Sequence, residues 1–390
     1  MTEVISPEIE TFEQKKIERE TDIDDSLLKD KLEEIRKNPH NFICDYVENL
    51  FPHIGRRVFE VVSLMPPSLI IPDLPYMNKS VRSNINCLFL APSGAGKTTL
   101  SKLFGEITLA PLEVESITPA RLESEISKNP KFSLIVGDFA RMSRDPIIIK
   151  IVEGILGEEK QAKRKTMVTD IDVQTEGIGL ICGTPQDLSA YLSGGILFRL
   201  IPIIIIHKPE EHAEIGEKIA DRIGNEDYSD ISERTIKFFY KELELIQEGQ
   251  HPNIKPIEGY IIEKRFSDLA KQEWKRITDG IVKETNMNFI RGLHEFFRIL
   301  ISHAFLNIFN RKIINNRLCP NEEDFTIALK IMIRTIETQY DILRTDRFIK
   351  SLRNLDELQR VMKNPAFKQK YKDYIKNMIK VKAGRVSVNG

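Results

Sequence analysis

The sequence predicts an α/β fold in which a parallel β-sheet lies between two layers of helices and is followed by a helical domain. In the first half of the chain, short apolar runs alternate with segments of helical periodicity, and one run leads directly into a glycine-rich turn. Strands separated by helices run parallel, because each helix returns the chain to the same edge of the sheet. The second half shows helical periodicity throughout.

In the first half, strands and helices are expected in alternation. A helical segment at 42–65 should end at Pro66 and Pro67, since proline interrupts helical hydrogen bonding. After it we predict, in chain order, a strand at 84–90, a helix at 98–106, a strand at 132–138, a helix at 146–156, and strands at 177–183 and 200–206.

The second half is predicted to be all-α. Helices are expected within 210–250, at 267–282 and at 288–310. Asn321 is a good N-cap with Asp324 three positions later, which predicts a further helix to about Leu343.

Four regions are expected from these patterns. Residues 1–40 form a charged segment, either a mobile tail or a surface helix. Residues 41–208 form the α/β core, and 209–343 a helical linker and lid domain. Residues 344–390 form a basic helical tail.

Composition narrows the class of protein less than the distribution of charge does. The formal net charge of −1 indicates no particular partner, but residues 1–40 carry 12 acidic and 7 basic side chains, and 341–390 carry 5 and 13. The basic end either meets a polyanion or presents a solvated helix surface.

Cysteine spacing and hydropathy predict a soluble cytoplasmic protein. The four cysteines lie too far apart in sequence for a metal site, so reduced thiols are expected. The first residues do not have the pattern of a signal peptide. The longest apolar stretch, 196–206, contains an arginine and is shorter than the roughly 20 residues that span a bilayer.

The glycine-rich turn has the pattern of a phosphate-binding loop. Such a loop turns backbone N–H groups toward the phosphates, while a lysine reaches their oxygens and the next hydroxyl holds Mg²⁺. It stands between a predicted strand and a predicted helix, the context that supports the motif. The nucleotide-binding residues, expected to hold ATP with Mg²⁺, are Ala91, Pro92, Ser93, Gly94, Ala95, Gly96, Lys97, Thr98 and Thr99.

Asp138, which ends the second apolar run, is the candidate acidic partner of this loop. P-loop ATPases hold Mg²⁺ through an aspartate after a buried strand, so Thr98 and Asp138 are the predicted metal ligands. The residue beside it is Phe139, so the usual neighbouring carboxylate is missing. Asp145 is a weak substitute for it. The other interpretation of Asp138 is a loop residue that caps the next helix.

Beyond the loop, the order of motifs resembles AAA+ ATPases, and most closely the ATPase module of minichromosome maintenance (MCM) helicases. The resemblance covers roughly 51–338. It rests on the segments 51–57, 91–98, 137–142, 178–185, 196–200, 291–300 and 321–328. The chain departs from the family in the missing glutamate, in a threonine where sensor 1 usually has asparagine, in a short segment at 109–131 and in the lack of a zinc-bearing N-domain.

The resemblance implies roles for several further residues. Thr184 would be the sensor-1 group. Arg199 would be an arginine finger that reaches the nucleotide of a neighbouring subunit, although a strand-end arginine at the surface is the alternative. Arg291 would be the sensor-2 group, with Arg298 as its alternative. The family carries a DNA-gripping β-hairpin between its second and third strands, which here would present Lys163, Arg164 and Lys165, unless these form only a solvated loop.

The expected function is therefore an ATP-hydrolysing AAA+ motor acting on DNA. It would be helicase-like, would serve DNA replication or processing, would act on single-stranded or forked DNA, and would form a homo-oligomeric ring, expected to be a hexamer. Two alternatives remain open. One is a slowly hydrolysing, ATP-dependent DNA-binding switch or assembly factor, which the missing glutamate favours. The other is a protein-remodelling AAA+ ATPase.

Overall fold

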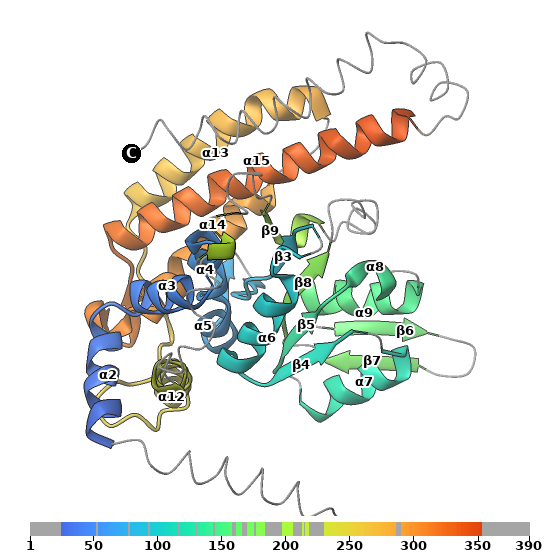
Figure 1. Cartoon of the computed structure of the whole chain (residues 1–390). Coiled ribbons are helices and arrows are strands. Elements are labelled where there is room, and N and C mark those ends of the chain that lie inside the picture. Colours follow the sequence, from blue (N-terminus) through green and yellow to red (C-terminus); the bar gives the residue numbers. More distant parts are fainter. Residues whose placement is uncertain are drawn as a thin grey trace, which may run out of the picture. The chain divides into compact units, whose positions relative to one another are not determined.

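A computed structural model of the chain describes 25–51, 54–76, 79–92, 94–115, 117–129, 131–142, 145–157, 161–165, 170–174, 177–183, 197–205, 213, 215–217, 230–285 and 290–352. The chain divides into two compact units, Met1–Gln339 and Tyr340–Gly390. The described part of the second unit is the last portion of helix α15. All other elements belong to the first unit (Figure 1).

The helices and strands of the described residues have the following bounds. The helices are α2 (Asp25–Lys37), α3 (Pro39–Leu50), α4 (Arg56–Val62), α5 (Met65–Ile70), α6 (Lys97–Ile107), α7 (Pro119–Lys128), α8 (Phe139–Met142), α9 (Pro146–Leu156), α12 (Asp230–Gln247), α13 (Lys264–Thr285), α14 (Ile290–Leu306) and α15 (Glu322–Leu352). The strands are β1 (Leu74–Tyr76), β2 (Lys79–Val81), β3 (Cys87–Leu90), β4 (Pro111–Val114), β5 (Ser133–Val136), β6 (Gln161–Lys165), β7 (Asp170–Gln174), β8 (Ile178–Gly183), β9 (Ile201–Ile204), β10 (Gly259–Tyr260), β11 (Lys312–Ile314) and β12 (Arg317–Cys319).

The core of the first unit is a five-stranded parallel sheet with the order β4-β5-β8-β3-β9. The strands β3, β5 and β8 are fully buried, which explains why they read as continuous apolar runs in the sequence. The predicted α/β class with a parallel sheet is confirmed. Strand β8 lies between β3 and β5, so the segments that follow all three strands meet at one edge, here called the carboxyl edge.

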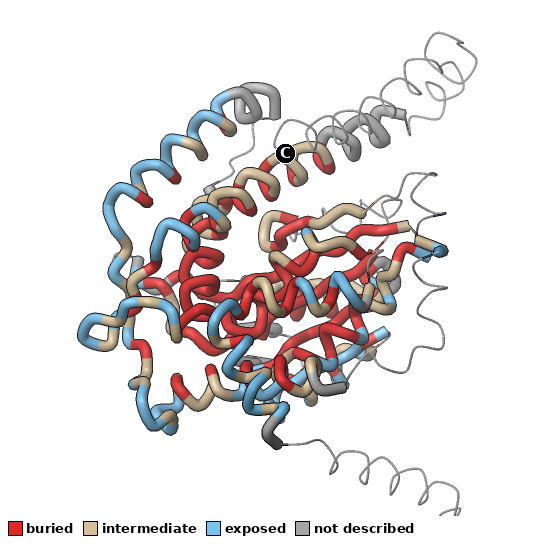
Figure 2. Tube along the Cα trace, turned by 60° about the vertical axis from the view of Figure 1, so that its left-hand side comes forward, coloured by how far each residue is buried: buried red, intermediate tan, exposed pale blue. Residues whose placement is uncertain are grey.

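Helices cover both faces of the sheet, as the contacts of two glycines show. Gly105 of α6 packs on Ile135, whereas Gly179 packs on Leu156 of α9. Leu134 is in register with Gly179, so Ile135 and Gly179 point to opposite faces of the sheet. The buried residues, red in Figure 2, fill the space between these layers and continue into the helices that surround them. The result is a helix–sheet–helix sandwich.

Polar side chains support the opposite, amino edge of the sheet. Asn84 donates from Nδ2 to the Gly177 carbonyl at 2.7 Å, and Asn86 accepts from the Gly179 N–H at 2.8 Å. Both asparagines are buried, so these bonds satisfy groups that water cannot reach. They hold the start of β8 against the segment that leads into β3.

The second half is mainly helical but not all-α, which corrects the sequence prediction. A small sheet of order β10-β12-β11 stands between the helices. Its strands are two or three residues long, too short to produce a recognisable alternation. Around it, α14 packs closely on α13 and α15, because Gly292 lies against Trp274 and Ile336.

One further expectation differs from the structure. Pro66 and Pro67 stand in the first turn of α5 and do not end a helix, since a first-turn proline loses no helical hydrogen bond. Within 1–40, where the sequence left a mobile tail or a surface helix open, helix α2 starts at Asp25 and buries Ile35 completely. Arg36 of α2 binds Glu242 of α12 through two hydrogen bonds of 3.0 and 2.5 Å.

The helix of the predicted capping motif forms as expected and runs longer. The side chain of Asn321 accepts from the N–H groups of Glu323 and Asp324, and Asp324 accepts in return from the Asn321 N–H at 2.8 Å. These reciprocal hydrogen bonds satisfy backbone N–H groups in the first turn of α15 that have no partner within the helix. The helix continues to Leu352, beyond the predicted end at Leu343.

Candidate functional site

The glycine-rich turn links β3 to α6 at the carboxyl edge of the sheet. Gly94 and Gly96 have φ angles of 82° and 87°, in the left-handed region that favours glycine. A Cβ at Gly94 would meet no atom within 4 Å, so the backbone conformation and not the space requires glycine there. The strand–turn–helix geometry expected for this loop is therefore present.

Lys97, the first residue of α6, folds back over the loop. Its Nζ donates to the carbonyls of Ala91 at 2.5 Å and Pro92 at 2.9 Å. The ammonium thus lies directly above the turn, half-buried, and is held by neutral acceptors. An anion placed there would offer this cation charge-assisted hydrogen bonds, which are stronger than bonds to carbonyls.

The amino end of α6 adds backbone donors to the same place. The first helical hydrogen bond of α6 joins the Leu100 N–H to the Gly96 carbonyl at 2.9 Å, so the N–H groups of residues 97–99 have no partner within the helix. Gly96 is the N-cap and has no side chain to cover them. The helix dipole and these donors favour a bound anion.

Asp138 lies two residues beyond the end of β5, at the same carboxyl edge, and its side chain is exposed. Only β8 separates β5 from β3. At about 4.8 Å per strand, Asp138 follows a strand roughly 10 Å from the strand that leads into the loop. Asp145 has a different role, because it caps α9 by accepting from the Ile147 N–H at 2.8 Å.

A second carboxylate, which the sequence prediction missed, lies beside Gly137, the residue before Asp138. Glu115 follows β4, where Val114 pairs with Val136 and accepts from the Gly137 N–H at 3.3 Å. The side chain of Glu115 therefore comes alongside Gly137, whose added Cβ would meet its Cγ at 4.0 Å. A signal did exist in the sequence, since Glu113 and Glu115 alternate with Leu112 and Val114 as in a strand.

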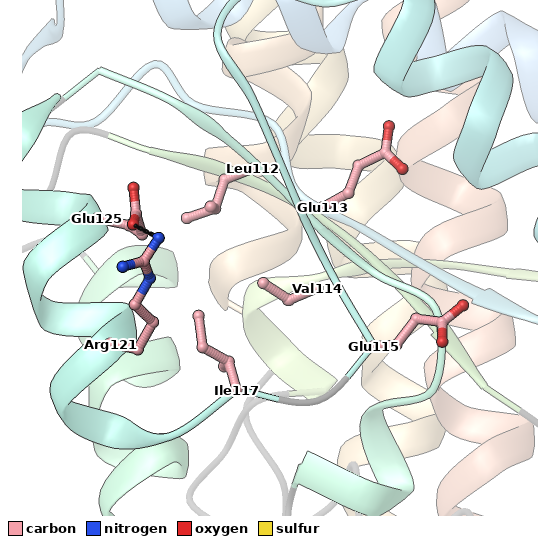
Figure 3. Close-up of a pocket in the computed structure, with 7 residues that line it drawn as sticks. All are labelled: Leu112, Glu113, Val114, Glu115, Ile117, Arg121 and Glu125. Atoms are coloured by element: carbon pink, nitrogen blue, oxygen red, sulfur yellow. Dashed lines mark ion pairs between the residues drawn. The ribbon is translucent and has the colours of Figure 1, made fainter. Parts of the chain in front are cut away.

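Glu115 also lies on the face of the sheet that α6 covers. Glu113, two residues earlier on the same face, packs against Gly105 of α6. Figure 3 shows Glu113 and Glu115 pointing away from the α7 side of β4, where Arg121 pairs with Glu125. Both glutamates belong to the lining of a surface pocket beside β4 and α7, but their carboxylates point away from the α7 side. Glu115, Asp138 and the amino end of α6 thus share one edge of the sheet.

Arg199 lies at the opposite edge. It ends a short 3₁₀ turn before β9, whose first residue Ile201 is in register with Cys87 at the start of β3. The loop at Ala91 is six residues further along in register, or about 20 Å at 3.3 Å per residue. Arg199 is therefore too far to touch a nucleotide in its own loop. Gln339 of α15 holds this turn by donating to the carbonyls of Leu197 and Leu200 at 3.2 Å each.

The two candidate sensor-2 arginines have different surroundings. Arg298 is buried, donates from Nε to the Arg82 carbonyl at 2.7 Å and pairs with Glu295, so its guanidinium is engaged within the fold. Arg291 lies half-buried in the first turn of α14, about 10 Å earlier along the helix. Its sensor-2 role stays a prediction.

The predicted basic residues stand on a hairpin. Strands β6 and β7 pair antiparallel, with Lys163 opposite Asp172, Arg164 opposite Ile171 and Lys165 opposite Asp170. The ends of this hairpin lie between α9 and β8, at the position in the chain that the sequence predicts. Ser93 and Thr184 lie outside the described residues.

Other candidate sites can be judged within the described ranges. There, no group of three or more His, Cys, Asp or Glu side chains could hold a metal by itself. The donor set of Asp138 and the exposed Thr98 suits Mg²⁺, which usually takes one or two carboxylates and completes its shell with phosphates and water. All four cysteines are free thiols, and burial raises the pKa of Cys182 to about 11.

None of the helices in the described part of the chain is long and apolar enough to cross a membrane. Comparison with models of known protein families gives no match for this chain, and no curated protein matches it.

Proposed function

We propose that this chain is a Mg²⁺-dependent P-loop ATPase whose nucleotide lies at the carboxyl edge of the sheet. The observation that carries the proposal is the loop Ala91–Thr98, with two left-handed glycines, folded between a buried strand and an uncapped helix terminus. A loop of this geometry directs backbone N–H groups and one lysine toward the same place. Such a group of donors suits a polyphosphate ligand.

In the proposed mechanism, Lys97 exchanges its two carbonyl acceptors for phosphate oxygens. The amides of residues 97–99 hold the same phosphates, while Thr98 and Asp138 are the ligands for Mg²⁺. When bound, Mg²⁺ supplies charge neutralisation of the phosphate oxygens. Asp138 and Glu115 would orient the attacking water, and its single proton would pass to one of these two carboxylates. Glu115 would take the place of the glutamate that is missing next to Asp138 in sequence.

We further propose that the active assembly is a ring of the AAA+ type with the second half of the chain as a lid. The position of Arg199 supports this idea, because an arginine about 20 Å from its own loop reaches a γ-phosphate only across a subunit boundary. In such a ring the β6–β7 hairpin would carry Lys163, Arg164 and Lys165 toward DNA. The favoured activity is then that of a DNA motor.

Binding of a fluorescent ATP analogue with Mg²⁺ tests the basic proposal. Lys97→Ala should weaken binding at least tenfold, whereas Lys102→Ala, an exposed lysine on the same helix, should leave affinity unchanged. Equal affinities for the two variants would reject the P-loop assignment. ATPase rates with and without single-stranded DNA then test the motor, and an assay that finds neither stimulation nor unwinding would reject it.

A slowly hydrolysing ATP-dependent switch is the second candidate, and a specific observation favours it. Asp138 is followed by the buried Phe139, so the second carboxylate has to come from β4. Single-turnover kinetics separates the two functions. Tight ATP binding with turnover slower than one per minute, unchanged by DNA, would identify the switch.

A further inference from the structure

Arg82 is a buried arginine that binds both ends of the β6–β7 hairpin. It follows β2 directly, and its side chain is 2% exposed. Its Nη1 donates to the carbonyls of Ile155 at 2.8 Å and Gly157 at 2.7 Å, and its Nη2 donates to the Gly177 carbonyl at 3.2 Å. Gly157 precedes the hairpin and Gly177 follows it. One guanidinium therefore closes the base of the hairpin.

The same residue is held from the other side by helix α14. The Nε of Arg298 donates to the Arg82 carbonyl at 2.7 Å, and Glu295, one turn earlier on α14, pairs with Nη1 of Arg298. Both members of this pair are buried. Taking such an ion pair out of water is costly, and apolar residues would fill the same space at lower cost. Stability alone therefore does not account for the pair, and its contribution is the hydrogen-bond geometry that the arginines impose.

Helix α14 is itself anchored at both ends. Near its start, Gly292 leaves room for Ile336 of α15 and Trp274 of α13 to pack directly on the helix. Near its end, the fully buried His303 binds Asp324 of α15 at 2.5 Å. These contacts fix α14 to α13 and α15. Arg291, the predicted nucleotide sensor, stands on the same helix as Arg298, about two turns away.

We propose that Arg82 and Arg298 are positioning residues that couple α14 to the β6–β7 hairpin, so that nucleotide binding sensed by α14 repositions the hairpin. This inference rests on the proposed ATPase function. The route runs from α14 through Arg298 to the backbone of Arg82, and from its guanidinium to the two ends of the hairpin. The links are hydrogen bonds, buried except for the part-buried bond to Gly157, and they join α14 to the residues on both sides of the hairpin.

Hydrogen exchange of the hairpin tests the coupling without relying on catalysis. Amide exchange over 158–176 is measured on the full-length protein with and without a slowly hydrolysed ATP analogue and Mg²⁺. In the wild type the nucleotide should change hairpin exchange several-fold. In Arg298→Lys and Arg82→Lys the change should fall below twofold, because an ammonium cannot reproduce the forked donor geometry. Analogue affinity should stay within threefold in both.

Two further variants complete the design. Arg334→Lys alters an arginine that binds Glu60 at 3.1 Å away from this route, and should keep the wild-type response. Glu295→Gln keeps the shape of the side chain at 295 but removes the charge that orients Arg298. It therefore tests the coupling between α14 and the hairpin even where a lysine variant does not fold. It should lose the response.

The outcomes separate the coupling from the proposed function. A wild type that binds the analogue without any hairpin response, or Arg298→Lys and Glu295→Gln variants that respond like the wild type, would overturn the coupling alone. A wild type that does not bind the analogue would overturn the ATPase proposal and the coupling with it.

Discussion

Asp324 and Asp138 are two aspartates of one chain in opposite surroundings. Asp324 is fully buried, and its two oxygens accept from His303, Arg311 and the Asn321 N–H at 2.5 to 2.9 Å. Asp138 is exposed at the carboxyl edge of the sheet. A carboxylate buried in such a network serves the stability of the fold, whereas one exposed at a strand end lies at a surface that a ligand can reach.

The pKa of the buried aspartate reflects the same contrast. Burial alone would raise the pKa of Asp324, but the hydrogen bonds and charges of His303 and Arg311 outweigh it and hold the pKa below its ordinary value. The neighbouring His40, whose ring lies 4.8 Å from that of His303, is also buried. Burial, followed by the influence of His303 and Arg56, lowers the pKa of His40 to about 3. The two shifts favour the charged form of Asp324 and the neutral form of His40.

The largest predicted effect is the loss of stability in Asp324→Ala. Removing one partner of a buried ionic network leaves Arg311 and His303 without their acceptor, which costs about 3–5 kcal/mol. Urea denaturation should show this decrease in the free energy of unfolding. The exposed neighbour Glu323 also binds Arg311, yet Glu323→Ala should cost less than about 1 kcal/mol. A loss below about 1 kcal/mol for Asp324→Ala would remove the contrast.

At the other aspartate the effect should fall on turnover and not on stability. We expect Asp138→Asn to lower kcat for ATP about 100-fold, the range for loss of a group that handles a proton or orients the attacking water, and to leave the midpoint of denaturation unchanged. Asp145→Asn is the matched control, because asparagine caps α9 as well as aspartate does. Equal losses of kcat in the two variants would reject the assignment of Asp138.

Acid should weaken the buried cluster before Asp324 is protonated. His40 has a lower pKa in the folded protein than the ordinary 6.5, so the unfolded chain binds the extra proton as the pH falls from 6.5 toward 3. Stability is therefore complete above pH 6.5 and declines by about 2–3 kcal/mol by roughly pH 4.5. The contribution of Asp324 is lost only at lower pH, as the pH falls below its ordinary value of 3.8.

Denaturation at several pH values measures this slope. His40→Gln removes the titrating ring, so its stability should change less between pH 6.5 and 4.5 than that of the wild type, whatever its absolute value. A variant with the wild-type slope would show that another group controls the acid response.

Much of the fold could be predicted because buried parallel strands leave a strong pattern in sequence. The runs that become β3, β5, β8 and β9 were placed within a few residues, and α9 has the predicted limits 146–156. Strand β4 was missed because it lies at the edge of the sheet. Its pattern begins with Pro111 and includes Glu113, so it does not form an apolar run.

The same reason limits what could be predicted of the candidate site. Lys97, Thr98 and Asp138 stand in recognisable motifs, and the structure brings them to one edge. Glu115 lies beside Gly137, and so near the strand end that leads to Asp138, only because β4 pairs with β5. This contact joins segments more than 20 residues apart, which local pattern does not reveal. The engagement of Arg298 with Arg82 likewise depends on packing between distant segments.

Glu115 therefore gives the test with the smallest expected effect in the comparison between the buried Asp324 and the exposed carboxylates at the carboxyl edge. It is exposed, so Glu115→Gln should leave stability within about 0.5 kcal/mol of the wild type. Because its proposed role is secondary to that of Asp138 and it lies one strand further from the phosphate loop, we expect a loss in kcat of about tenfold, smaller than that for Asp138→Asn, with KM nearly unchanged. Glu113→Gln is the matched control, since Glu113 lies on the same strand and face but packs against α6. If steady-state kinetics gives both glutamine variants the wild-type kcat, the second carboxylate is not supplied by the end of β4, and the slow switch becomes the better proposal for this chain.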